Sequence, residues 1–159
     1  MAQFTITIKK LSVYDEVSKS TAYSGAKAED DSAYERIFAT DANRDILERF
    51  WAETCSAATA EFKPFISNVT EIEESRNVDV TKDYIVTLLL SNSFDANLKN
   101  SMENSLFSFF VNNIVSKWLK YADKTDAPTF ANDAATAMLD VKSKLYYRKK
   151  PTRKLIPIS

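Results

Sequence analysis

A long run of apolar residues at helical spacing, from about residue 94 to residue 121, constrains the fold of this chain most strongly. Its members recur every three or four positions, which is the period of an α-helix with one buried face. Phe107, Val111 and Leu119 widen that face, so we expect neighbours to cover the helix on more than one side. Asn92 or Ser93 is expected to cap it. The main stripe consists of Leu98, Met102, Leu106, Phe109, Phe110, Ile114, Trp118 and Tyr121.

Two further helices are expected, one on each side of this one in the sequence. The earlier one begins at Thr40, whose hydroxyl can cap the N-terminus, and Pro64 ends it because proline cannot continue a helix. The later one begins at Asp126 and Pro128, the usual order of cap and proline. Its apolar residues continue at helical spacing to Leu145.

The remaining segments predict short strands and a loop. Near the N-terminus, Phe4, Ile6 and Ile8 alternate with threonines, the period of a half-buried strand. Residues 18–31, which hold the only glycine and lead into an acidic stretch, are expected to form a loop. Residues 68–91 predict a β-hairpin. Its second strand is apolar on both faces, so we expect it to be buried in the sheet.

Together these elements predict an α+β, mainly α fold, with three or so core helices, a short N-terminal strand and an inserted β-hairpin. The 159 residues are 45% hydrophobic, enough for one core in one ordinary domain. We therefore expect a single helical domain over residues 1–146, with the hairpin at about 68–91, and an extended basic C-terminal arm over 147–159. The N-terminus does not resemble a signal peptide, and no apolar run is long enough to span a bilayer, so a soluble protein is expected.

Charge divides the chain unequally. Residues 141–159 contain seven basic residues and no acidic ones, whereas residues 1–140 contain 14 basic and 22 acidic residues. The end of the chain thus carries +7 and the rest −8, although the total is only −1. Such a split predicts that the arm binds an anionic surface, which could belong to a neighbouring copy of the same protein.

The residue types needed for the commonest catalytic sites are missing. The chain has no histidine, one cysteine and one glycine, which excludes the usual nucleophile–base triads, zinc-finger spacings and glycine-rich phosphate loops. Asp41 and Asp45 lie one helical turn apart, but a solvated helix N-terminus favours acidic residues in any case. Cys55 lies in an apolar helical pattern and is expected to be a buried small residue. We therefore expect no enzymatic activity, no cofactor and no metal site.

The basic C-terminal segment is the one stretch that suggests an interaction site. Its cations are interleaved with two tyrosines, a composition that suits a phosphate backbone or an acidic protein surface. A solvated end, protein–protein docking and nucleic-acid binding all remain open on composition alone. The candidate contact residues are Lys142, Lys144, Tyr146, Tyr147, Arg148, Lys149, Lys150, Arg153 and Lys154.

The order of these elements carries a resemblance to a known class of proteins. An acidic amphipathic helix precedes a hairpin, a long aromatic-rich helix and a last helix that closes on a basic segment. The chain resembles small structural proteins encoded beside capsid and tail genes in phages and prophages of gut Bacteroidales. It is similar, more loosely, to head–tail connector (adaptor) proteins of long-tailed phages. The stretches concerned are Tyr34–Phe38, Leu47–Trp51, Ser105–Phe110, Lys117–Trp118 and residues 145–153.

This resemblance implies a structural virion protein at the phage head–tail junction. Connector proteins form rings below the portal from helical subunits whose extended arms reach neighbouring subunits. We therefore expect a homo-oligomeric ring that contacts portal and tail-completion proteins, with non-specific contact to packaged DNA and no membrane partner. Such a protein is made in the cytoplasm of the bacterial host and resides in the virion. The alternatives are a nucleic-acid-binding accessory protein that uses the basic segment, and another minor capsid or tail-completion component.

Overall fold

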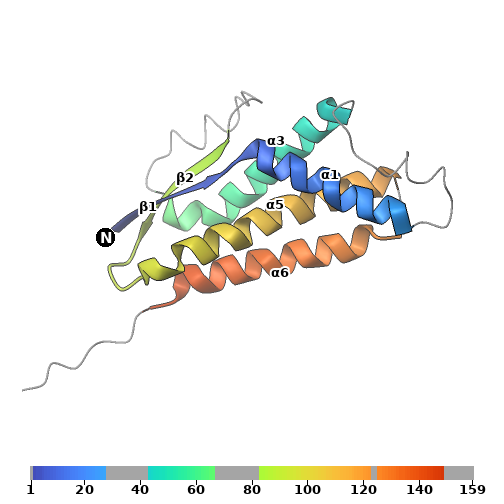
Figure 1. Ribbon diagram of the computed structural model, residues 1–159. Helices are drawn as coiled ribbons and strands as arrows, with labels where there is room; N and C mark the ends of the chain where they lie inside the picture. The colour runs from blue at the N-terminus through green and yellow to red at the C-terminus, as the bar shows by residue number, and fades with distance from the viewer. Residues whose placement is uncertain (1, 28–42, 67–82, 123–124, 149–159) are drawn as a thin grey trace, which may run out of the picture.

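Four α-helices and a two-stranded sheet make up the part of the chain that the computed structural model describes, which is residues 2–27, 43–66, 83–122 and 125–148 (Figure 1). The fold is therefore α+β and mainly α, as the sequence predicts. In chain order the elements are β1 (Ala2–Ile8), α1 (Lys10–Lys27), α3 (Arg44–Phe62), the 3-10 turn η2 (Lys63–Phe65), β2 (Tyr84–Leu90), the 3-10 turn η3 (Ala96–Leu98), α5 (Lys99–Ala122) and α6 (Ala127–Tyr146).

Helix α5 is the centre of the packing. It lies antiparallel to α6 along most of its length, and α1, α3 and β1 pack on its other sides (Figure 1). The broad apolar face expected from the sequence is confirmed, because neighbours on several sides bury it. Its fully buried side chains include Met102, Leu106, Phe110, Ile114 and Leu119. They belong to one hydrophobic core within the described residues.

The sheet pairs two strands that are far apart in the sequence. β1 and β2 are antiparallel, in a register that places Ala2 opposite Leu90 and Ile8 opposite Tyr84. Alternate residues such as Val86 and Leu88 face the core and are buried. We expected β2 to be buried on both faces, which is wrong, because Ile85 is 55% exposed on the outer face. The first half of the hairpin expected at 68–91 lies outside the described residues.

The prediction of a loop at residues 18–31 is wrong over residues 18–27, because these residues form the second half of α1. The buried face of this half is made by Val17, Thr21 and Ser24, which follow helical spacing but are not all apolar. The Thr21 hydroxyl donates a hydrogen bond to the Val17 carbonyl of the same helix, at 2.9 Å. A hydroxyl with such a hydrogen bond can be buried at little cost in free energy. A hydropathy pattern therefore underestimates the length of this helix.

Two expected helix ends agree with the structure, but the long helix expected from about residue 94 begins as an α-helix only at Lys99. Helix α3 ends at Phe62 before the turn that contains Pro64, and α6 begins directly after Asp126, as expected, but the Asp126 side chain makes no capping hydrogen bond. The expected cap Thr40 lies outside the described residues. Neither Asn92 nor Ser93 caps the long helix, since Asp95 accepts the Asn97 amide at 3.0 Å and begins the 3-10 turn that leads into α5. None of the helices within the described ranges is long and apolar enough to cross a membrane.

Candidate interaction site at the end of helix α6

The candidate contact residues begin in the last turns of α6, which holds them on a fixed support. Met138, Val141 and Leu145 are buried against the core and anchor this end of the helix. Their neighbours on the helix surface therefore point outward in a defined direction. At Tyr147 the backbone becomes extended, with φ −66° and ψ 135°, and the helix ends.

Lys142 and Lys144 are paired with carboxylates of the same chain. The Lys142 ammonium forms an ion pair with Glu61 near the end of α3, which ties α6 to α3. The Lys144 ammonium pairs with Asp140 and also donates to the Ser105 hydroxyl on α5, at 3.2 Å. Hydrogen bonds from Lys144 and Ser105 lower the pKa of the Asp140 carboxyl. These two lysines thus fix α6 on the body before the basic segment continues.

Tyr146, Tyr147 and Arg148 form the exposed part of the site. Tyr146 is 60% exposed, and its ring meets the ring of Phe65 edge to face with 5.3 Å between centroids. The Arg148 guanidinium donates to the carbonyl oxygens of Leu145 at 2.9 Å and Tyr147 at 3.1 Å. Its charge therefore lies at the negative C-terminal end of the helix, where a cation is favoured. The remaining four candidates, Lys149, Lys150, Arg153 and Lys154, lie outside the described residues.

A second polar cluster, which the sequence did not reveal, lies where β1, α1 and α3 meet. Lys10 is only 5% exposed, and its ammonium forms an ion pair with Glu48 on α3. Its backbone amide donates to the Asp83 carboxylate at 2.9 Å, just before β2 begins. The same ammonium lies 5.6 Å from the centre of the Tyr14 ring, and the Arg44 guanidinium lies 5.8 Å from it.

Tyr14 is buried beside this cluster, whereas Cys55, expected to be buried, is only partly buried, and both are held in their neutral forms. Burial and the nearby Glu48 carboxylate raise the pKa of the Tyr14 hydroxyl, which has no hydrogen bond of normal geometry among the described residues. Burial raises the pKa of the Cys55 thiol to about 12. A neutral phenol and a neutral thiol are poor nucleophiles, so the cluster has the chemistry of a structural junction.

The raised pKa of Cys55 predicts slow alkylation of the folded protein. At pH 8 the thiolate should be so scarce that iodoacetamide reacts about a thousandfold more slowly than with the urea-unfolded chain, whose thiol has an ordinary pKa near 8.5. Mass spectrometry of timed samples measures both rates. Equal rates in the two states would show that the thiol is accessible and not held in its neutral form.

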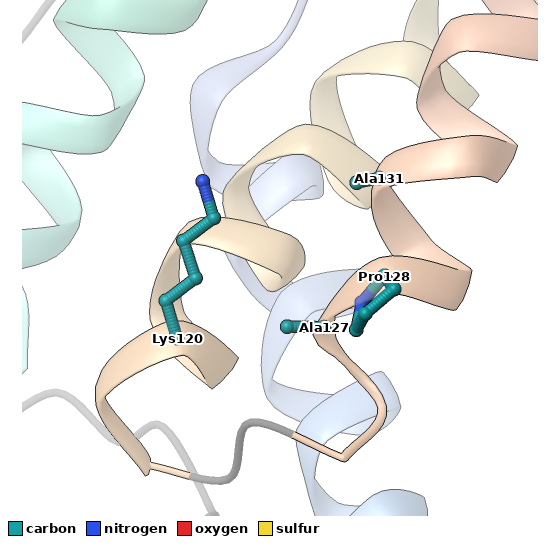
Figure 2. A pocket seen from close by; sticks show the side chains of 4 residues that line it. All are labelled: Lys120, Ala127, Pro128 and Ala131. Carbon is teal, nitrogen blue, oxygen red and sulfur yellow. The ribbon is translucent and has the colours of Figure 1, made fainter.

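The structure also contains a shallow hollow at the other end of α6. Lys120 on α5 and Ala127, Pro128 and Ala131 on the first turns of α6 line about 390 Å³ of space. Figure 2 shows the Lys120 side chain extended away from the helix junction, so the three α6 residues form the apolar wall. Within the described residues, no group of three or more acidic or cysteine side chains is arranged to hold a metal ion.

Comparisons with protein-family models, curated proteins and solved structures gave no match for this chain.

Proposed function

We propose that this chain is a structural protein of the bacteriophage head–tail junction, which assembles into a homomeric ring through its basic C-terminal arm. The observation that carries the proposal is the division of charge, +7 in residues 141–159 against −8 in the rest of the chain. Adjacent copies of such a chain are complementary, because the arm of one can bind the body of the next. A contact of this kind is heterologous, and it produces a ring when the rotation between copies closes.

An ion pair of α6 supports a protein surface as the partner of the arm. Lys142 already binds the Glu61 carboxylate on α3, so a cation of this helix has a suitable partner on the surface of the protein itself. The acidic body repels DNA, which opposes binding to phosphates beyond the arm. Portal and tail-completion proteins are the further partners under this proposal, with only non-specific contact to packaged DNA and no membrane contact.

The proposal predicts oligomers that dissociate as salt is added. Light scattering coupled to gel filtration should show assemblies larger than a monomer at low ionic strength and a shift toward monomer between about 0.05 and 0.5 M salt, where screening becomes short-ranged. Changing Lys149, Lys150, Arg153 and Lys154 to glutamine should give monomers at all salt concentrations. A control with the same change in net charge replaces Lys9, Lys19, Lys63 and Lys99, and it should keep the wild-type oligomers. Equal loss in both variants would show that net charge matters and the arm does not.

A nucleic-acid-binding accessory protein is the second candidate. An exposed tyrosine, Tyr147, stands beside the Arg148 guanidinium, which is the combination that stacks on bases and neutralises phosphates. Mobility-shift assays with duplex and single-stranded DNA separate the two functions. Binding that disappears in the four-glutamine variant, from a wild-type protein that is monomeric, would support this second function and contradict the first.

A further inference from the structure

The outer surface of α6 carries a second apolar stripe beside the buried one. Pro128, Ala131, Ala135 and Leu139 are all exposed and follow each other at intervals of three or four residues, so they form one line along the helix. Leu139 is the largest side chain of the four and is 66% exposed. We name these four residues the outer stripe.

The hollow beside Lys120 continues this stripe at its N-terminal end. Pro128 and Ala131 belong to both, so the outer stripe leads directly into a concave surface (Figure 2). The hollow is shallow and holds about 390 Å³ of space. The stripe and hollow together offer an apolar surface on which a short extended segment could lie.

The chain leaves α6 at the end of the helix opposite the hollow. The extended backbone at Tyr147 carries the chain onward from the end of α6, and the coloured ribbon in Figure 1 runs past the helix away from the bundle. The arm is proposed above to bind another molecule. Under the proposed function, that molecule is the next copy in the ring.

The end of the arm has the composition and length that the outer stripe requires. Leu155, Ile156, Pro157 and Ile158 follow the basic run and are all apolar. Extended, four residues span about 13 Å, and the stripe from Pro128 to Leu139 is about 17 Å long. Pro157 has no amide N–H. The segment therefore has one backbone donor fewer that would lack a hydrogen bond against an apolar surface.

Charge sets the register of the arm. Lys120 at the hollow repels the basic run, so the apolar end is the part of the arm that can lie beside it. We propose that Leu155–Ile158 of one copy dock on the outer stripe of its neighbour, with an apolar side chain in the hollow. This inference rests on the proposed ring assembly and identifies the surface that receives the arm.

Disulfide trapping between full-length chains tests the contact. Cys55 is first changed to alanine, after which Ala131→Cys is made in one chain and Ile156→Cys in another. On oxidation, the mixed proteins should give a cross-linked dimer in about tenfold higher yield than a control mixture of Ser101→Cys and Ile156→Cys, because a disulfide forms only when the Cα atoms approach within about 7 Å. Ser101 is exposed at the opposite end of α5 from the hollow.

Leu139→Asp gives a second readout that does not depend on oxidation. It should raise the protein concentration needed for assembly about tenfold, as expected for the loss of an apolar contact at an interface. The thermal melting curve should not change. Wild-type oligomers that neither cross-link at Ala131 nor weaken in Leu139→Asp would overturn this inference and leave ring assembly standing. A cross-link formed within one chain carrying both cysteines would overturn it in favour of a folded-back arm. A wild-type protein that stays monomeric would contradict both proposals.

Discussion

Replacing Phe110 with alanine is expected to lower the free energy of unfolding by about 4 kcal/mol. Phe110 is fully buried in α5, and its ring joins three elements of the fold. The ring centre lies 5.1 Å from that of Trp51 on α3 and 5.2 Å from that of Tyr84 on β2. Truncation removes these contacts and leaves a cavity that aromatic neighbours on separate elements cannot all move to fill.

Urea denaturation followed by circular dichroism measures this loss. Phe107→Ala is the matched control, since it removes the same side chain from the same helix at a position that is only partly buried. Its cost should be clearly smaller, because less apolar surface returns to water. If the two variants lose equal stability, Phe110 is not the centre of the core. The Phe110 variant should also lose any arm-dependent assembly, since α6 is held in place by α5.

Periodicity predicted those helices whose buried faces are mostly apolar. The stripes of α3, α5 and α6 repeat every three or four residues, and Pro64 and Pro128 mark helix ends by removing a backbone donor. In α1 the pattern fails, because Thr21 and Ser24 occupy core positions where the hydropathy of threonine and serine predicts exposure. Hydrogen bonds inside the helix allow these side chains to be buried, and a hydropathy scale takes no account of such bonds.

The pairing of the sheet is a second feature that the local sequence pattern could not predict. The residues of β1 and β2 alternate as strands do, but their pairing joins segments about eighty residues apart in the chain. A local pattern predicts that a strand exists and not which strand it pairs with. The exposure of Ile85 follows from that pairing, because a two-stranded sheet with one face on the helices leaves its other face outside.

The composition of the candidate site could be predicted from the sequence, but its geometry could not. The basic run at the end of the chain is visible in the sequence, but the binding of Lys142 to Glu61 depends on α3 and α6 ending side by side. The buried Lys10 was equally hidden, since a lysine between a strand and a helix ordinarily suggests a solvated turn. Its partner Glu48 is 38 residues away in the sequence.

Replacing Glu48 with alanine is expected to cost about 3 kcal/mol of stability, because it leaves the Lys10 charge buried without a partner. The Lys10 side chain is 6% exposed and that of Glu48 is 20% exposed, so water cannot fully replace the lost carboxylate. The pair joins the start of α1 to α3, and the Lys10 amide also holds Asp83 at the start of β2. Its loss should therefore loosen three elements at once, which urea denaturation would detect as a lower midpoint.

Glu53→Ala on the same helix is the matched control. Glu53 pairs with Arg49 and Lys117, but its side chain is 42% exposed, so its loss should cost less than about 1 kcal/mol. Joint replacement of Lys10 by methionine and Glu48 by leucine should recover most of the stability, since apolar side chains of similar size can replace a buried ion pair. A double variant as unstable as Glu48→Ala would show that packing at α3, and not the unpaired lysine charge, accounts for the loss.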